Sequence, residues 1–509
     1  MTLRSVLALL LFPLAGAAAE PAITFEELPN PAAASGASGS SLAVDPAGNA
    51  WLTWLETEGR ATALRFSRFD PAQRRWTPAA TVARGEGWFV NWADFPALTA
   101  DGHGRATAVW FVNNPETPPP PGTTSHAGDH HGPGYRAFIS ATADHGKTWD
   151  HPVPLTRESQ SVEFVSLATL ADGRVLAAWL DGRARHRGGK FQQLFARVLG
   201  TSGPDTLVDP AVCDCCQTTL TAFPDGTALL AYRGRTEDEV RDIRVTRFRG
   251  DTWDPPRPLS QDDWRLNACP VNGPQLASDG GRVAAAWYTA ADNDPRVLVS
   301  FSPDAGGRFL LPLAVNDTKP AGRVATAILR DGALLVTWVD LAGTLWLRRI
   351  TPDFTSTPPL PLTSASAARV KGFPRLALVR DYLGGNEPAR LLVTYTSDAP
   401  PAVRTLLVTI PEGELLTAEK NCDCAPTPEQ LRGYPIRGTV LRARPEAGRL
   451  EIRHGEVPGV IAAGDREMRV APELQAGASQ PGREFLGRIE RRDGAWWLFD
   501  VRFIVSRPR

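Results

Sequence analysis

A pattern of short apolar strands recurs seven times between residues 41 and 410, and it constrains the fold more than any other feature of this chain. The pattern is an apolar strand, a turn, a second strand ending near Trp or Tyr, a third strand, another turn and, in all units but the last, a fourth strand. Helical periodicity is nearly absent. The units begin near Ser41, Pro96, Ser166, Thr218, Pro274, Ala325 and Pro374. A spacing of about 40–50 residues fits one four-stranded blade, so the repeat predicts an all-β propeller.

The number of blades follows from counting fourth strands. Asp-Gly or an equivalent turn joins the first two strands in most units, a strong hairpin signal. Six units have a recognisable fourth strand, whereas the seventh shows three strands and ends at Ile410. The segment Ile23–Leu28 can supply the missing outer strand and remove an exposed sheet edge. The sequence therefore predicts seven blades over residues 23–410, with six as the alternative.

Residues 142–149, Thr-Ala-Asp-His-Gly-Lys-Thr-Trp, match the Asp-box of sialidase-like (BNR-repeat) propellers, and residues 302–309 are a looser copy. In such a box the Asp accepts backbone N–H groups, the Gly permits a positive φ and the aromatic residue packs between sheets. This role is structural. The resemblance covers residues 23–410 and implies the fold.

The same resemblance implies a possible sialidase chemistry, with an arginine triad, a tyrosine nucleophile assisted by Glu, and an Asp acid/base. The Arg-Ile-Pro motif that carries the first arginine in that family is missing, and we assign no catalytic residue. A dense charged loop, residues 233–242, is expected on the face opposite the Asp-boxes, where it could bind a polar ligand or pair internally. The candidate ligand-binding residues are Arg183, Arg233, Arg241 and Asp242.

Four cysteines stand at equivalent places in neighbouring units. Cys213, Cys215 and Cys216 precede the fourth unit, and Cys269 precedes the fifth. Adjacent blades bring such loops together, so the thiols are expected to cluster. Two alternatives follow: disulfides, as is common in exported proteins, or a thiolate site for Cu(I) or zinc.

A long insertion in the second unit, residues 113–135, contains His126, His130 and His131. Short His-rich tracts often bind metal, so these residues are candidate ligands. The alternative is a flexible polar loop with weak incidental affinity.

The repeat stops at residue 410, and residues 411–432 are predicted to be a linker that holds Cys422 and Cys424, two further candidate ligands. Residues 433–509 predict a small OB-like β-barrel. The segments 438–459 and 491–500 resemble the CusF-like periplasmic copper-binding domain, which binds Cu(I) through a His and Met residues. His454 stands at the His position, but Ile461, Gly464 and Arg466 stand where Met is expected. The resemblance thus implies a domain that has lost most of its copper site.

Residues 1–19 have the pattern of a secretory signal peptide, so the mature protein is expected in the periplasm or outside the cell. No later segment is apolar for long enough to span a membrane. The 55 basic and 56 acidic residues argue against nucleic acid as a partner. We therefore expect a non-enzymatic binding protein linked to copper handling, with a metal ion or small polar ligand, and another periplasmic protein, as its candidate partners. The alternatives are a sialidase-like, glycan-active or glycan-binding propeller and a protein-interaction scaffold.

Overall fold

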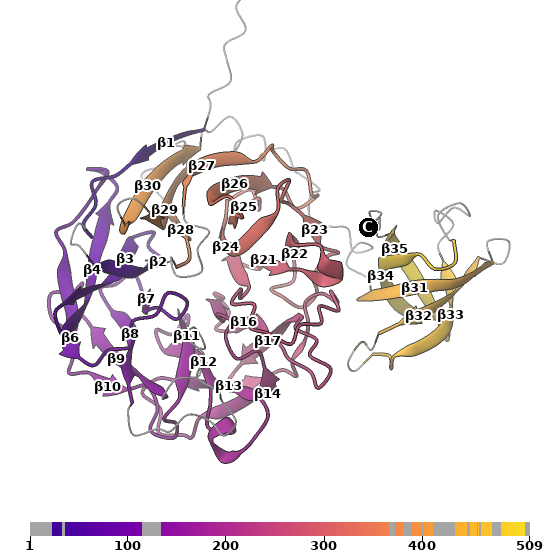
Figure 1. Cartoon of the computed structure of the whole chain (residues 1–509), viewed down its shortest axis with the longest axis horizontal. Coiled ribbons are helices and arrows are strands. Elements are labelled where there is room, and N and C mark those ends of the chain that lie inside the picture. Colours follow the sequence, from indigo (N-terminus) through magenta and orange to yellow (C-terminus); the bar gives the residue numbers. More distant parts are fainter. Residues whose placement is uncertain are drawn as a thin grey trace, which may run out of the picture.

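The computed structural model describes residues 23–32, 36–114, 134–365, 372–379, 389–398, 401–410, 433–444, 448–455, 457, 460–470 and 480–503. Within these residues, seven antiparallel sheets form a disc and five further strands close a barrel beside it (Figure 1). The prediction of an all-β, seven-bladed propeller followed by a small barrel is confirmed. None of the helices in the described part of the chain is long or apolar enough to cross a membrane.

The blades are numbered in chain order, and each is an antiparallel sheet of four or five strands. Blade 1 contains β2 (Ala37–Val44), β3 (Ala50–Glu58), β4 (Ala61–Asp70), β5 (Arg75–Trp76) and β6 (Ala80–Glu86). Blade 2 contains β7 (Ala97–Ala100), β8 (Ala106–Asn113), β9 (Tyr135–Thr142) and β10 (Val153–Pro154). Blade 3 contains β11 (Val162–Thr169), β12 (Val175–Asp181), the 3-10 helix η1 (Arg185–Arg187), β13 (Gln192–Val198) and β14 (Thr206–Val212).

The remaining blades follow the same order. Blade 4 contains β15 (Thr219–Ala222), β16 (Ala228–Arg233), β17 (Ile243–Arg249), β18 (Thr252–Trp253) and β19 (Arg257–Pro258). Blade 5 contains β20 (Gln275–Asp279), β21 (Arg282–Thr289), the 3-10 helix η2 (Ala291–Asn293), β22 (Arg296–Ser302) and β23 (Leu313–Ala314). Blade 6 contains β24 (Pro320–Ile328), β25 (Leu334–Asp340), β26 (Thr344–Ile350) and β27 (Leu360–Ser364). Blade 7 contains β28 (Arg375–Val379), β29 (Ala389–Asp398), β30 (Pro401–Ile410) and β1 (Thr24–Glu27).

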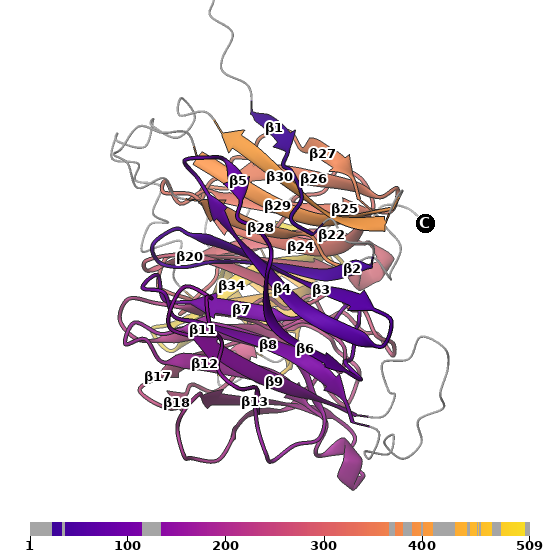
Figure 2. The ribbon, with the colours of Figure 1, turned by 90° about the vertical axis from the view of Figure 1, so that its left-hand side faces the viewer.

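The ring is closed by the first strand of the chain. β1 pairs antiparallel with β30, with Thr24 opposite Thr409 and Glu27 opposite Leu406. Across the junction of blades 1 and 7, Trp76 Nε1 donates to Thr405 Oγ1 over 3.0 Å. Figures 1 and 2 show β1 at the outer edge of blade 7. The predicted closure by the N-terminal segment is confirmed.

Large side chains on the second strands fill the space between blades. Trp54, Trp179, Trp287 and Trp338 are all buried. Alanines accompany them on the same strands, as at residues 284–286, where their small side chains let neighbouring sheets approach. Each buried indole removes a large apolar area from water, so these residues contribute much of the interblade stability.

The Asp-boxes have the geometry that their sequence predicts. Asp144 accepts hydrogen bonds from the backbone N–H of Thr148 at 2.9 Å and from its hydroxyl at 2.6 Å. These bonds hold the pKa of Asp144 below its ordinary value. Gly146 has φ 84°, and a Cβ there would collide with the ring of Phe66. Glycine is therefore required by both the backbone and the packing.

The small body is a closed barrel in the order β31-β32-β33-β35-β34, with β33 and β35 parallel. This closed five-stranded arrangement is as expected for an OB-like domain. Its core includes Ile436, Val440, Ile452, Met468 and Phe485. Its strands are β31 (Tyr434–Arg444), β32 (Arg449–His454), β33 (Gly464–Val470), β34 (Glu484–Arg492) and β35 (Ala495–Phe503).

Two arginines of the barrel bind blade residues and place it beside blade 5 (Figure 1). Arg488, which is buried, donates from Nη1 to the carbonyl oxygen of Phe309 at 2.8 Å and from Nη2 to that of Gly433 at 2.9 Å. Arg437 donates to Asp292 Oδ2 at 2.6 Å. Charge-assisted bonds at a buried position are the stronger kind, so Arg488 is the main polar anchor.

Replacing Arg488 by Met should weaken the attachment of the barrel, because it leaves the Phe309 carbonyl without its donor. We expect the free energy of unfolding to fall by about 1–3 kcal/mol and the barrel to be released faster in limited proteolysis. Arg491→Met, an exposed change on the same strand, is the matched control. Indistinguishable denaturation and cleavage of the two variants would contradict this role.

Candidate metal centre

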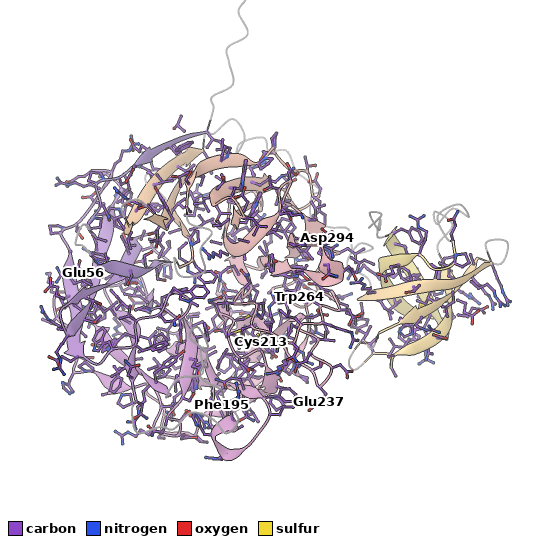
Figure 3. The ribbon with its side chains drawn as sticks, viewed as in Figure 1. Glu56, Phe195, Cys213, Glu237, Trp264 and Asp294 are labelled. Atoms are coloured by element: carbon purple, nitrogen blue, oxygen red, sulfur yellow. The ribbon has the colours of Figure 1, made fainter. Side chains whose placement is uncertain are left out.

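Three thiols converge in the loop that leaves blade 3 and enters blade 4. Cys213 follows β14, and Cys215 and Cys216 lie in the turn before β15. The Cys213 sulfur lies 3.4 Å from that of Cys216 and 3.9 Å from that of Cys215. All three residues are buried. The sulfur atoms of the three cysteines all lie within 4.8 Å of one another, and Figure 3 labels Cys213 among the side chains of the propeller.

Hydrogen bonds to the backbone hold this loop against its neighbours. The Cys213 N–H donates to the carbonyl of Arg233 at 3.0 Å. The Gln217 side chain donates to the Ala93 carbonyl at 2.7 Å and accepts from the N–H of Gly273 at 3.1 Å. One glutamine thus joins the loops that precede blades 2, 4 and 5. This junction is the reason that thiols from two loops meet.

The fourth cysteine lies at the partly exposed side of the cluster. Cys269 belongs to the loop between β19 and β20, and it is close enough to hydrogen-bond with the Cys215 thiol. The structure thus brings together all four cysteines that the sequence groups.

No disulfide links the four cysteines that the structure describes. The closest pair, Cys213 and Cys216, has a sulfur–sulfur distance of 3.4 Å, well beyond the ~2.05 Å of a disulfide bond. The structure therefore does not show the disulfides that the sequence analysis gave as one alternative for these cysteines.

The three buried thiols have unequal acidities. Burial opposes ionisation of Cys213, but hydrogen bonds from the Cys215 and Cys216 thiols and the charges of Arg241 and Arg233 lower its pKa well below the ordinary value. Arg241 Nη1 lies 3.2 Å from the Cys213 sulfur. Burial and the neighbouring Cys213 raise the pKa of Cys215 and Cys216. Of the three thiols, Cys213 is therefore the one whose ionised form the surroundings favour.

Charged side chains surround the sulfurs in a connected network. Asp214 accepts from Arg185 at 2.8 Å and from Arg235 at 3.0 Å. Glu239 accepts from Arg235 and Arg241, both at 2.8 Å. Three guanidinium groups (residues 185, 235 and 241) pair with these two carboxylates, and the charge of Arg233 also acts on Cys213, so the four arginines exceed the two carboxylates by two positive charges. Such a shell favours additional negative charge on the sulfurs.

The residues predicted to bind a polar ligand have internal partners in the structure. Arg183 contacts Asp181, Asp205 and Glu158. Arg233, fully buried, donates to the carbonyls of Asn272, Arg241 and Tyr288. Asp242 accepts from the backbone N–H groups of Asp263 and Trp264. A ligand role for Arg183, Arg233, Arg241 and Asp242 stays a prediction, and Arg241 is the one that contacts the thiols.

A buried acidic group near the thiol loop is absent from the candidate site residues chosen from the sequence. Asp94, before β7, accepts from the Tyr135 hydroxyl at 2.6 Å and from the Phe164 N–H at 2.9 Å. Burial raises the pKa of Asp94 to about 7, and burial together with the Asp94 charge raises the pKa of Glu163 to about 8. The signal in the sequence was position: Asp94 occupies the same inter-blade loop in blade 2 that the cysteines occupy in blades 4 and 5.

The remaining candidate ligands are separate from this centre. His126, His130, His131, Cys422 and Cys424 lie outside the described residues. His454 is buried in the barrel, where Nδ1 contacts the Gly455 carbonyl at 2.8 Å and Nε2 has no hydrogen-bond partner among the described residues. Met468 lies in the barrel core. A copper site at His454 stays a prediction.

No protein-family model matches the chain, and no curated protein matches its sequence. The CusF-like resemblance therefore has no support beyond the residues that suggested it. Solved structures with a similar fold include a protein of unknown function from Dyadobacter fermentans (14% identity, 74% of this chain and 94% of that one, TM-score 0.41). Another is the Hadza microbial sialidase Hz136, with 13% identity over 73% of this chain and 65% of that one and a TM-score of 0.40. A third is a Penicillium chrysogenum α-L-arabinanase, with 12% identity over 76% of this chain and 98% of that one and a TM-score of 0.40.

Identities of this size and TM-scores near 0.4 establish neither a shared family nor a shared activity. The choice of function therefore depends on the chemistry of the residues.

The raised carboxyl pKa values predict that stability falls as pH rises. Asp94 and Glu163 hold their protons to about pH 7 and 8 in the folded chain but lose them near pH 4 when unfolded. The folded state therefore binds more protons between these limits, and the free energy of unfolding decreases across them.

Glu163→Gln should flatten this dependence and retain about 3–4 kcal/mol of the free energy of unfolding that the unmodified protein loses between pH 5 and pH 8. Urea denaturation at both pH values measures it. The exposed change Glu237→Gln is the control. An unaltered pH slope in Glu163→Gln would show that this carboxyl is not protonated in the fold.

Proposed function

We propose that this protein is an exported binding protein that holds one Cu(I) ion through Cys213, Cys215 and Cys216, with Cys269 as a neighbouring fourth thiol. The observation that carries the proposal is the convergence of three buried sulfurs with no disulfide between them. Soft thiolate sulfur selects Cu(I), zinc or iron–sulfur clusters among the common metals.

The spacing of the sulfurs suits a shared ion. Sulfurs about 2.3 Å from a shared ion are about 4.0 Å apart in a three-coordinate site and about 3.8 Å apart in a tetrahedral one. Of the two distances from Cys213, the 3.9 Å to Cys215 matches these values, and the 3.4 Å to Cys216 requires a small outward movement. Buried sulfurs also exclude the water that would otherwise compete for the ion. The loop is thus close to the geometry that it would need when loaded.

The charge of the surroundings favours Cu(I) with three thiolates. One monovalent ion and three thiolates carry a net charge of −2, which offsets the excess of two positive charges in the guanidinium shell. Zinc with four thiolates would carry the same charge but needs Cys269 as a full ligand. Cys269 is the partly exposed member. The role of Cys269 therefore distinguishes the two metals.

The mature chain, reconstituted without oxygen, should bind one equivalent of Cu(I) in competition with a chromogenic Cu(I) chelator. Cys213→Ser should weaken binding by more than about 100-fold, since even an outer-shell partner contributes about 10–100-fold. Arg241→Met, which removes the guanidinium at 3.2 Å from the Cys213 sulfur, should weaken it by about 10–100-fold. Cys269→Ser should have a smaller effect on Cu(I) than on zinc.

Two control variants separate this centre from the other candidate ligands. The first control removes the linker thiols by Cys422→Ser and Cys424→Ser. The second removes the imidazoles of the histidine loop by changing His126, His130 and His131 to Ala. Both variants should still bind one equivalent of Cu(I) tightly. Loss of binding in either control with retention in Cys213→Ser would refute the proposal. So would a purified protein whose four clustered thiols are oxidised in pairs and take up no metal.

The glycan-active alternative has one specific observation in its favour. Asp94 and Glu163 are carboxyl groups with raised pKa values, and a glycosidase acid needs a carboxyl that stays protonated near neutral pH. Against it, Arg183 and Arg233 are bound internally rather than open for a substrate carboxylate. Hydrolysis of sialosides or arabinans by the protein, abolished in Asp94→Asn but intact in Cys213→Ser, would establish it. We expect no such activity.

A further inference from the structure

The loop between blades 3 and 4 contains a C-x-x-C sequence, because two residues separate Cys213 from Cys216. Asp214 and Cys215 lie in the turn between them, so the two cysteines occupy the first and last positions of that turn. The Cα atoms at these positions of a β-turn are less than about 7 Å apart. Disulfides span Cα distances of about 4.4–6.8 Å. The backbone of this loop therefore permits a disulfide between Cys213 and Cys216.

The two sulfur atoms of this pair are already close. They lie 3.4 Å apart, nearer than the 3.9 Å between the sulfurs of Cys213 and Cys215. Closure to the ~2.05 Å of a disulfide requires an approach of about 1.4 Å, which rotation of the two side chains can supply. Cys213 is therefore better placed to bond with Cys216 than with Cys215.

Neighbouring guanidinium groups make Cys213 the reactive member of the pair. Arg241 Nη1 lies 3.2 Å from the Cys213 sulfur, and the charge of Arg233 also acts on it. Both favour the thiolate, which is the form of cysteine that attacks a disulfide. The same charges favour the reduced state over the oxidised one, because a disulfide sulfur carries no negative charge to balance them. A disulfide whose reduced form is stabilised in this way is readily reduced, so the bond would be reversible.

Cys269 offers a route from the surface to the buried pair. It is the partly exposed cysteine of the cluster, and its thiol is close enough to hydrogen-bond with that of Cys215. The Cys215 sulfur in turn lies 3.9 Å from that of Cys213. Thiol–disulfide exchange needs such contacts, since each step joins an attacking thiolate directly to a disulfide sulfur. The four sulfurs thus form a path from the partly exposed thiol to Cys216.

We propose that Cys213 and Cys216 are a reversible redox pair that controls the metal site: the dithiol binds the ion, and the disulfide does not. The effect on copper rests on the proposed function, whereas the disulfide itself does not depend on metal. Oxidation removes two of the three buried sulfur ligands, because the thiolate is the form that binds metal. A bound ion protects the pair, since binding and oxidation compete for the same sulfurs.

The oxidant is a small-molecule disulfide. The Cys269 thiolate attacks one of its sulfurs and releases one external thiol, and Cys215 then attacks the mixed disulfide and releases the second. The Cys213 thiolate next displaces Cys269 from Cys215, and Cys216 finally displaces Cys215 from Cys213. Each exchange forms one sulfur–sulfur bond and breaks one. Overall, two protein thiols give two electrons and two protons to the external disulfide, which becomes two thiols.

The test is incubation of the full mature chain, without metal or oxygen, in mixtures of reduced and oxidised glutathione. After free thiols are blocked, peptide mapping by mass spectrometry should locate a disulfide between Cys213 and Cys216 that forms and disappears as the glutathione ratio changes. Cys216→Ser should lose it. Cys269→Ser should still form it, but more slowly. The linker variant Cys422→Ser with Cys424→Ser is the matched control and should retain both its formation and its rate.

Arg241→Met removes the guanidinium beside the Cys213 sulfur. It should shift the equilibrium toward the disulfide by about tenfold or more, the usual effect of losing a hydrogen bond to a charged group. Arg241→Lys keeps a positive charge and should restore most of the original ratio. A role for Arg241 in packing alone would leave the ratio unchanged.

After glutathione is removed, the reduced chain should bind one equivalent of Cu(I). The oxidised chain should bind it more than about 100-fold more weakly, since even an outer-shell partner contributes about 10–100-fold. Equal Cu(I) affinity of the two forms would overturn the switch. A disulfide that maps to other cysteines, or none at any glutathione ratio, would overturn the redox pair. Absence of Cu(I) binding by the reduced chain would instead refute the proposed function, while the mapping decides the disulfide by itself.

Discussion

The pairing of β1 with β30 is the interaction on which the rest of the structure depends. Seven sheets around an axis enclose a core only when the last sheet meets the first, and the missing strand of blade 7 comes from residues 24–27. Without it, β30 would present an open edge, which invites association with other chains. The closure fixes the angle between every pair of blades. It also fixes the distances between loops that are far apart in the sequence.

The sulfur cluster is a consequence of that geometry. Cys213, Cys215 and Cys216 belong to one loop, and a neighbouring loop 53 positions beyond Cys216 supplies Cys269. Gln217 links both loops to the one before blade 2. A rigid ring can therefore hold unpaired buried thiols in place without a disulfide. The guanidinium groups near the sulfurs stabilise a thiolate there, and Asp214 and Glu239 hold three of those groups in position.

Features with a local repeat could be predicted from the sequence. The Asp-Gly turns and the regularly placed tryptophans predicted the number and position of the blades, and the missing fourth strand of the seventh unit predicted closure by the N-terminal segment. Because Cys269 and the other three cysteines occupy equivalent positions in adjacent repeats, their proximity could also be predicted. Side-chain contacts between different blades could not be predicted, because a sequence repeat does not show which residues of one sheet face which residues of the next. Hence the contact between Asp94 and Tyr135 was missed, and so was the internal bonding of Arg183 and Arg233. Charge alone did not separate an arginine with partners inside the fold from one that is open to a ligand.

The central claim, that the three buried sulfurs bind Cu(I), is tested most directly by X-ray absorption at the copper edge on the reconstituted mature chain. The account predicts a first shell made of sulfur alone, three atoms at about 2.2–2.3 Å, as expected for thiolate ligands. A first shell dominated by nitrogen or oxygen would contradict it and would place the metal on histidines instead of on Cys213, Cys215 and Cys216.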